Sequence, residues 1–417
     1  MRKIYTSIDI GTDTIKFVVG EVVGKEVVVL ASYAKKSSGI RKGLIVDANL
    51  AINAIKDGSK EVENLLGIPI KKVIVGVPAY DVKFILVNES LDLSDEGVTS
   101  FDVNKIIKNS VYKKIDPDFE LVTVIPINFT VDDIKNLEFP VGIKGKKLLM
   151  KGIIVSVPQK NVYSVVSVVV GAGLEVVDIT LSGIGDYYEV RNNQLDKQVG
   201  AVINLGHQTT TVSIVNKAKL MNTSVIQLGG KNIDNDLSVV FGINVIDARE
   251  MKEKFGCAHK RFTQLNDVYE VKNSNGEMVK INQLETCEVI MSRLKEIMAI
   301  VKKQILSLTK QSISYVIITG GMTEIKSFKY LAYEIFGKDV IIYSIPTLGV
   351  RDNKYTTSLG MIKYFHHKML VRGKDYSMVN SLEELQLVTP SDDKARKHDD
   401  TKITKLFGGL FSSKEEK

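Results

Sequence analysis

Short runs in which apolar and polar residues alternate recur along this chain, and stretches with helical periodicity separate them. Residues 7–19 and 202–215 each combine two such runs with a glycine-containing turn, which predicts two β-hairpins. Apolar residues at helical spacing predict helices over 50–66, which ends at Gly67, and over 284–308. Buried strands are predicted over 71–77 and 315–319. This mixture of strands and helices is typical of an α/β fold.

The two predicted hairpins are copies of one another. Residues 7–14 align with residues 202–209 at a constant offset of 195, and each copy continues into an alternating apolar run. The alignment pairs Asp9 with Asn204, Gly11 with Gly206 and Thr14 with Thr209. The shared order of acid or amide, glycine and hydroxyl favours a duplicated unit over a chance match.

Composition narrows the class of protein. A chain of 417 residues with 44% hydrophobic and 25% charged residues is typical of a globular protein with two or three domains, and it excludes a disordered or fibrous chain. The most apolar stretch, 162–184, is interrupted by Glu175 and Asp178, and no apolar run reaches about 18 residues, so no membrane-spanning helix is predicted. The first residues lack a signal-peptide core, so we expect the protein to stay in the cytosol.

Charge and cysteine content exclude further classes. The net charge of +7 is modest and spread along the chain, so it predicts no nucleic-acid partner. Cys257 and Cys287 are the two cysteines, and their spacing fits neither a disulfide framework nor a zinc site. We expect two reduced thiols.

Glycine-rich hairpins are suited to binding phosphate. A turn that contains glycine lets backbone N–H groups approach an anion closely, and two such turns that face each other could hold both sides of a triphosphate. Asp9 precedes the first turn and could accept hydrogen bonds from Mg²⁺-bound water. Either hairpin alone could be an ordinary turn, but the fixed offset and a third glycine element, Gly320–Gly321 after a strand, favour a nucleotide site.

The third element carries a family resemblance. Residues 316–325 resemble the adenosine motif of the actin/Hsp70/sugar-kinase superfamily, and the two hairpins resemble its two phosphate motifs. Further stretches resemble the bacterial cell-division FtsA family within it, namely 38–43 with Asp47, 124–126, 140–145, 228–236, 247–257 and 355–360. The resemblance implies an actin-like fold of two ribonuclease-H-like halves around an ATP cleft, over residues 4 to about 368.

The resemblance also implies site residues. Phosphate loop 1 would contain Gly11, Thr12, Asp13 and Lys16, and loop 2 Gly206, His207, Gln208 and Thr209. A loop closing over the nucleotide would contain Gly229, Gly230 and Lys231. The ribose or adenine would contact Lys252 and Glu253. The adenine pocket would be lined by Gly320, Gly321 and Met322. Alternatively, Lys252 and Glu253 belong to a solvated helix face.

One position departs from the superfamily pattern. Strong ATPases of the superfamily usually carry an aspartate where this chain has Asn204, and an amide cannot act as a base. His207 and Gln208 are near enough in sequence to be candidates for the γ-phosphate, although the sequence alone places neither there. The chain is therefore expected to bind ATP and Mg²⁺ tightly with slow or negligible hydrolysis.

The family architecture implies subdomains with the following boundaries. They are 1A over 1–83 and 161–199, an inserted 1C over 84–160, 2A over 200–226, 2B over 227–311, the rest of 2A with a closing helix of 1A near 357–370 over 312–370, a flexible linker over 371–400 and an amphipathic helix over 401–417.

Partners follow from the same resemblance. FtsA proteins polymerise on the cytoplasmic face of the membrane, tether FtsZ there and help to assemble the division septum with other division proteins. Segment 84–160 would be needed for filaments, and the FtsZ tail would dock on 2B. The helix predicted over 284–308 could supply a basic, partly apolar face for it, with Arg293 as the candidate contact, although surface charge alone is the alternative reading.

The C-terminal tail has the pattern of a membrane-surface helix. Ile403, Leu406, Phe407, Leu410 and Phe411 share one helical face. Lys402, Lys405 and Lys414 supply charge for anionic headgroups. A helix of about 13 residues is roughly 20 Å long and too short to span a bilayer, so it would lie in the interface. Packing back on the globular body is the alternative.

Two other functions remain open. A sugar or acetate kinase shares the hairpins and the glycine turn, but no catalytic aspartate beside a sugar pocket is recognisable. A pilus-type actin-like membrane adaptor is the other, and the division-family stretches disfavour it. An Hsp70-type chaperone would need a β-rich domain for which too few residues remain.

Overall fold

Two five-stranded sheets form the centre of the computed structural model, which describes residues 2–94, 97–264 and 266–388. The first has the order β11-β6-β1-β2-β3, with strands Glu175–Leu181, Lys72–Val77, Ile4–Ile10, Thr14–Val23 and Glu26–Lys36. The second has the order β14-β13-β12-β17-β18, with strands Lys219–Ile226, Thr210–Asn216, Val199–Leu205, Tyr315–Thr319 and Val340–Ile342.

The two sheets have the same connectivity. In the first, β1 pairs antiparallel with β2 and parallel with β6, and in the second, β12 pairs antiparallel with β13 and parallel with β17. Asp9 lies opposite Lys16 and Asn204 opposite Thr211, so the offset of the sequence repeat is also the offset of the strand register. The predicted hairpins and the duplication are confirmed.

The predicted helix at 50–66 is α1 (Ala48–Leu66), which covers the first sheet together with α3 (Gln159–Gly171). Asp47 begins α1 because its side chain accepts a hydrogen bond from the Leu50 N–H. Gly67 ends it in the left-handed conformation, at φ 79°.

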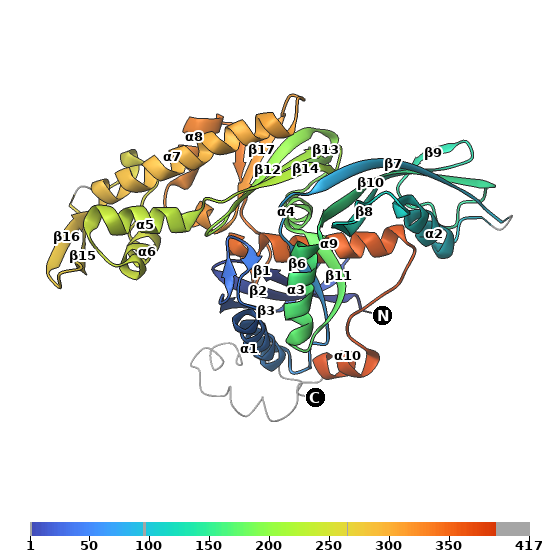
Figure 1. Ribbon diagram of the computed structural model, residues 1–417, viewed down its shortest axis with the longest axis horizontal. Coiled ribbons are helices and arrows are strands. Elements are labelled where there is room, and N and C mark those ends of the chain that lie inside the picture. The colour runs from blue at the N-terminus through green and yellow to red at the C-terminus, as the bar shows by residue number, and fades with distance from the viewer. Residues whose placement is uncertain (1, 95–96, 265, 389–417) are drawn as a thin grey trace, which may run out of the picture.

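Two helices lie between the sheets and connect the halves (Figure 1). They are α4 (Ser182–Val190) and α9 (Thr356–Val371), and both contact strands of the first sheet while α4 also contacts the second. They cross at Gly185 and Gly360, where a methyl group on Gly360 would lie 1.7 Å from the Gly185 carbonyl oxygen. Glycine at both positions therefore allows the backbones to touch.

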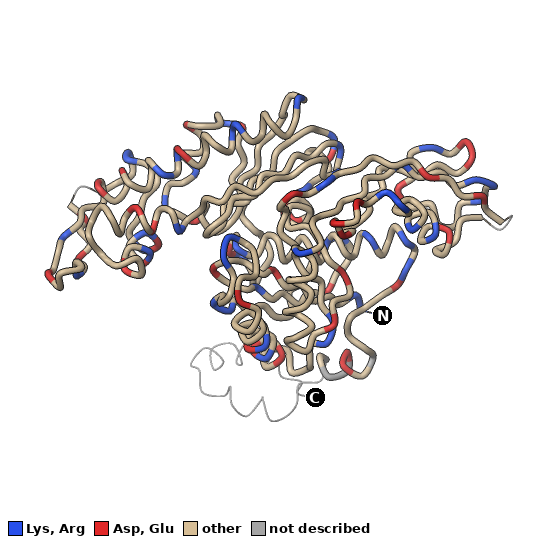
Figure 2. Tube along the Cα trace, viewed as in Figure 1, with Lys and Arg blue, Asp and Glu red and all other residues tan. Residues whose placement is uncertain are grey.

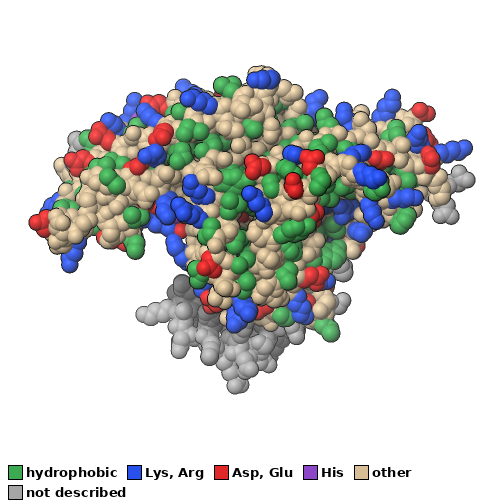
Figure 3. Space-filling model, in the orientation of Figure 1, with side chains coloured by type: hydrophobic (Ala, Val, Ile, Leu, Met, Phe, Trp, Pro, Cys, Tyr) green, Lys and Arg blue, Asp and Glu red, His purple; other side chains and the backbone are tan. Residues whose placement is uncertain are grey.

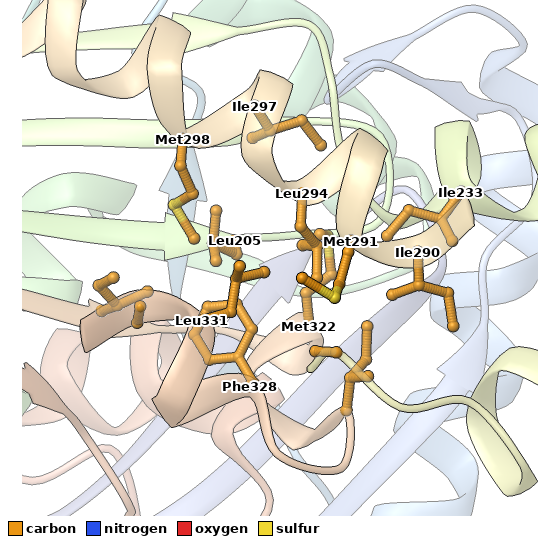
Figure 4. Packing of buried hydrophobic residues seen from close by; sticks show 14 of the residues in the cluster. Leu205, Ile233, Ile290, Met291, Leu294, Ile297, Met298, Met322, Phe328 and Leu331 are labelled. Carbon is orange, nitrogen blue, oxygen red and sulfur yellow. The ribbon is translucent and has the colours of Figure 1, made fainter. Parts of the chain in front are cut away.

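The outer part of the second half is mainly helical. It contains α5 (Gly230–Phe241), α6 (Val245–Lys254), the hairpin of β15 (Val268–Lys272) and β16 (Met278–Asn282), α7 (Gln283–Leu308) and α8 (Phe328–Phe336). The predicted long helix is α7, and its apolar stripe of Ile290, Leu294, Ile297 and Met298 packs toward Leu205, Phe328 and Leu331 (Figure 4). This packing joins the helices to the second sheet in one core.

A separate four-stranded sheet lies on the opposite side of the molecule from β15 and β16 (Figure 1). Its order is β7-β10-β8-β9, with strands Lys83–Asp92, Lys147–Pro158, Phe119–Val131 and Ile134–Leu137, and α2 (Ser100–Val111) covers one face. It occupies the segment for which an inserted subdomain is predicted and has its own core, around Val103, Ile106 and Phe129.

The predicted linker over 371–400 begins too early. Residue 371 is still in α9, and α10 (Ser381–Val388) packs near the start of β1, where the Met378 N–H donates to the Ile4 carbonyl. Glu383 pairs with Lys71 at 2.9 Å, and Met378 and Val379 are buried. The polar composition on which the linker rested begins only at 390, outside the described residues together with the predicted tail helix at 401–417.

Charges are interspersed over the surface. Figure 2 shows Lys, Arg, Asp and Glu mainly on the outer helices and loops, and the face in Figure 3 carries both signs side by side. Within the described residues, no helix has the length and apolarity needed to cross a membrane. Cys257 and Cys287 are free and buried.

Candidate functional site

A cavity of about 490 Å³ opens between the two halves, where the β1–β2 turn, the β12–β13 turn and the segment after β17 converge. Most of the residues singled out in the sequence line it. They are Asp9, Gly11, Thr12, Asp13, Lys16, Asn204, Gly206, His207, Thr209, Gly230, Lys252, Glu253, Gly320, Gly321 and Met322. Segments as far apart in sequence as 9 and 322 thus meet at one site.

Loop 1 is held tightly at its glycine. A methyl group on Gly11 would lie 2.7 Å from the Thr14 carbonyl oxygen, so the turn needs a residue without a side chain. Lys16 lies opposite Asp9 on the neighbouring strand, and its Nζ is 2.9 Å from Asp9 Oδ2. The first loop therefore places one carboxylate and one ammonium side by side in the cavity.

Loop 2 has the same turn with different side chains. A methyl group on Gly206 would lie 2.8 Å from the Thr209 carbonyl oxygen. Burial lowers the pKa of His207 to about 4, against the opposing effect of Asp13, so the ring is neutral at pH 7. Gln208 does not line the cavity, because its side-chain oxygen accepts a hydrogen bond from the Lys42 N–H at 2.9 Å. In the structure this side chain joins the two halves.

The predicted closing loop supports loop 2 instead. The N–H groups of Gly230 and Lys231 donate to the carbonyls of Gly206 and His207, and a methyl group on Gly229 would meet the Gly206 carbonyl oxygen at 2.5 Å. Gly229 and Lys231 are not among the lining residues, whereas Gly230 is. The start of α5 therefore holds loop 2 in place through these two backbone hydrogen bonds.

Lys252 is not part of a solvated face. Its Nζ lies 2.5 Å from Asp234 Oδ1, and the two side chains are only 7% and 1% exposed. Glu253, by contrast, is half exposed and pairs with Arg249. Lys252 thus reaches the cavity wall from a buried ion pair between α5 and α6.

The glycine pair after β17 forms the remaining wall. Gly320 has φ 97°, and a methyl group there would lie 2.4 Å from Asn204 Oδ1 and 2.5 Å from the Leu205 carbonyl oxygen. Gly321 has no atom within 4 Å of such a methyl group. Met322 is 95% buried and belongs both to the wall and to the core of Figure 4.

The sequence missed a buried acid, Asp186 of α4. It lines the cavity and accepts hydrogen bonds from Asn204 Nδ2 at 2.8 Å and from Thr357 Oγ1 at 2.6 Å. Burial raises the pKa of Asp186 to about 7, despite these two donors. A carboxyl of this kind can exchange a proton with water near neutral pH. No motif marks it in the sequence, because only the crossing of α4 and α9 brings it to the site.

The sequence also missed Arg249, which joins the halves across the cavity. Its guanidinium, on α6, binds both carboxylate oxygens of Asp13 in loop 1, at 2.5 and 2.8 Å. Arg249 lies inside a stretch, 247–257, that resembled the family, but its partner could not be read from the sequence.

Other candidate residues lie elsewhere. Arg293 of α7 does not line the cavity and is bound by Asp236, at 2.6 and 2.9 Å, and by Glu296, at 2.6 Å. It therefore ties α7 to α5 and is not a free cation. Ile403, Leu406, Phe407, Leu410 and Phe411 lie outside the described residues. Among the described residues, no three His, Cys, Asp or Glu side chains are grouped to hold a metal ion.

Comparison with protein families identifies the group to which this architecture belongs. The family model "Cell division protein FtsA" matches residues 201–360, and the model "SHS2 domain inserted in FTSA" matches residues 81–156, where the separate four-stranded sheet lies. Together they match more than half of the chain. The chain belongs to the FtsA family.

Cell division protein FtsA of Enterococcus hirae is 29% identical over 86% of this chain and 82% of that protein, and FtsA of Bacillus subtilis (strain 168) is 26% identical over 94% and 90%.

Solved structures confirm that this FtsA-family chain has an actin-like fold. MreB5 of Spiroplasma citri bound to ADP superposes with a TM-score of 0.56 at 14% identity, over 88% of this chain and 97% of that one. PilM in a PilM–PilN type IV pilus biogenesis complex superposes with a TM-score of 0.57, also at 14% identity, over 86% and 97%. At these identities the likeness concerns the fold alone.

Proposed function

We propose that this chain is an ATP-binding, filament-forming adaptor that attaches FtsZ to the membrane during division. The main support for nucleotide binding is the cavity between the repeated loops. Its lining includes Gly11, Gly206 and Gly320, and a methyl group on any of them would clash with neighbouring atoms. Backbone so close to a cavity suits phosphate and adenine. The MreB5 structure, which has ADP bound, shares the fold.

Titration of the full chain with a fluorescent ATP analogue tests nucleotide binding. ATP should displace the analogue and raise the melting temperature, because a ligand that binds only the folded state stabilises it. A sugar or acetate should add nothing, and further stabilisation by either would support the kinase alternative. Absence of any ATP effect would contradict the proposal.

Mg²⁺ would enter with the nucleotide. Asp9 supplies one carboxylate beside loop 1, and Mg²⁺ is commonly held by one or two carboxylates, water and substrate phosphates. The bound ion would neutralise phosphate charge. Lys16 would orient Asp9 through their ion pair. Asp9→Asn should therefore lower the affinity for ATP in the presence of Mg²⁺ more than it lowers the affinity for ATP without metal.

Hydrolysis is proposed to be slow. Asn204 provides an amide where strong ATPases of the superfamily have a carboxylate, and it donates to Asp186. Asp186 is the buried group able to take a proton from water, so Asp186→Asn should remove whatever slow phosphate release occurs. Sustained turnover that Asn204→Ala abolishes would contradict the proposal.

Filament formation is proposed to need the inserted segment 84–160. Head-to-tail contacts between copies do not close and so give filaments. Deletion of this segment should give a monomer that still binds ATP, since none of the described residues of 84–160 lines the cavity. Electron microscopy on a lipid monolayer provides the measurement, and filaments of the deleted chain would contradict the assignment.

FtsZ tail binding is proposed for the helical part of the second half. Arg293→Glu is a poor test because it would place a carboxylate beside Asp236 and disturb the contact of α5 with α7. Within the described part of the chain, Lys295 on α7 pairs only with Glu334, at 3.4 Å, and both side chains are about half exposed, so Lys295→Glu should disturb the fold less and should weaken binding of an acidic tail peptide. Lys135→Glu on β9 is the control with the same charge change, and equal effects of both would place the site elsewhere.

Membrane attachment is proposed for the tail, at the cytoplasmic side of the division site. Truncation after Asp400 should abolish co-sedimentation with anionic vesicles and leave ATP binding intact. Phe407→Glu combined with Phe411→Glu should do the same without shortening the chain. Weak single tails would bind together once the chain polymerises. Unchanged pelleting of either variant would contradict the assignment.

A further inference from the structure

The cations around the cavity are already paired. Among the described residues, every lysine and arginine that lines the cavity binds a carboxylate. Lys16 binds Asp9, Lys252 binds Asp234, Lys354 binds Asp352, and Arg249 binds Asp13 and Glu253. A phosphate group that enters must therefore share or displace a carboxylate to reach a cation.

The pair of Asp13 with Arg249 differs from the other three. Lys16, Lys252 and Lys354 each bind a carboxylate of their own half, whereas Asp13 belongs to loop 1 of the first half and Arg249 to α6 of the second. The contact is bidentate, at 2.5 and 2.8 Å, and Lys36 adds a third bond to Asp13 at 2.7 Å. Arg–carboxylate pairs of this geometry are strong.

The sequence repeat allows the charge at Asp13 to be compared with the equivalent position in loop 2. At the offset of 195, Asp13 corresponds to Gln208 in loop 2, and each of these side chains binds a residue of the opposite half. Loop 2 does so with a neutral amide, whereas loop 1 places a negative charge in a phosphate loop. Burial raises the pKa of Asp13, but the bonds from Arg249 and Lys36 outweigh it and hold this pKa well below its usual range, so the charge persists at pH 7.

We propose that Asp13 competes with the phosphate groups of a bound nucleotide for Arg249, and so lowers the affinity of the cavity for nucleoside polyphosphates. This inference rests on the proposed nucleotide binding. Arg249 would be the cation for which the Asp13 carboxylate and the phosphate groups compete. Adenosine, which has no phosphate, should be insensitive to the exchange.

Titration of the full chain with ATP and with adenosine tests the competition. Asp13→Asn should bind ATP about tenfold more tightly than the unsubstituted chain and adenosine equally well. Asp57→Asn removes a carboxylate that pairs with Lys35 on the same half, and it should leave ATP affinity within about twofold. Asp13→Ser provides a second variant with a short polar side chain.

Arg249→Gln separates competition from simple repulsion. In this background the gain from Asp13→Asn should fall to about threefold or less, because the cation at issue is absent. An Asp13→Asn chain that binds ATP no more tightly, or a full tenfold gain without Arg249, would overturn the inference. If neither the unsubstituted chain nor the Asp13 variants bind ATP, the proposed function itself fails.

Discussion

At the residue scale, the site depends on glycines that admit no side chain and on a carboxyl that is removed from water. Gly320 has a positive φ and faces Asn204, while its neighbour Gly321 faces open space. Asp186 is the buried acid between Asn204 and Thr357.

Gly320→Ala should lower the free energy of unfolding by about 2 kcal/mol or more, because the methyl group is both strained and in contact with Asn204 and Leu205. It should also weaken ATP binding, since relief requires the wall of the cavity to move. Gly321→Ala is the matched control and should change stability by less than about 0.5 kcal/mol. Urea unfolding of both variants decides, and equal losses would contradict the expected difference.

Asp186→Asn should change the pH dependence of stability. In the unfolded chain this carboxyl loses its proton near pH 4, whereas in the folded chain its pKa is about 7, so the folded state binds more protons between these values. The contribution of Asp186 to stability therefore falls as pH rises from about 4 to about 7, by on the order of 3–4 kcal/mol.

An asparagine can still accept from Asn204 and Thr357 but carries no charge. Relative to the unsubstituted chain, the variant should therefore gain stability between pH 5 and pH 8. Urea unfolding at both pH values measures the gain. A difference that is the same at both would show that Asp186 titrates in the folded chain as it does in water.

At the element scale, helix boundaries follow local signals but helix contacts do not. The Asp47 cap and Gly67 set the ends of α1, as the sequence predicts. The crossing of α4 with α9 rests on Gly185 and Gly360, which look like unfavourable residues in helices until their contact is known. Packing outweighs intrinsic propensity at this point.

Gly360→Ala should destabilise the chain by more than about 3 kcal/mol, although alanine is the better helix former. The methyl group would lie 1.7 Å from the Gly185 carbonyl oxygen, so the two helices must separate. Leu370→Ala on the exposed side of α9 is the control and should cost less than about 1 kcal/mol. Thermal unfolding of both variants measures the difference, and a stable Gly360→Ala chain would show that the crossing of α4 and α9 can relax.

At the scale of the whole molecule, the segment that follows α9 packs against the first strand, β1. The segment after α9 carries Met378 and Val379 into buried positions beside Ile4, and α10 adds the Lys71–Glu383 pair. A proposed membrane tail would therefore start from the first half, close to α1, and not from the end of α9.

A chain that ends at residue 388 should keep its melting temperature within about 2 °C, whereas one that ends at residue 375 should lose several degrees. The shorter chain exposes apolar surface of Ile4 and Ile68 that residues 378–387 cover. Differential scanning calorimetry distinguishes the two. Equal melting temperatures would mean that the segment contributes nothing to the fold.

The sequence determined the repeated hairpins, the helices α1 and α7, the α/β class and the glycine loops that meet at the cavity, because periodicity, caps and glycine turns are local properties. Tertiary structure alone decided the rest. Asp186 became a site residue through the crossing of two helices, and Gln208 and Asp13 were engaged by partners from the opposite half. Arg293 was bound by Asp236, 57 residues away. Charge pairing and burial depend on which segments meet, and a linear pattern does not contain that information.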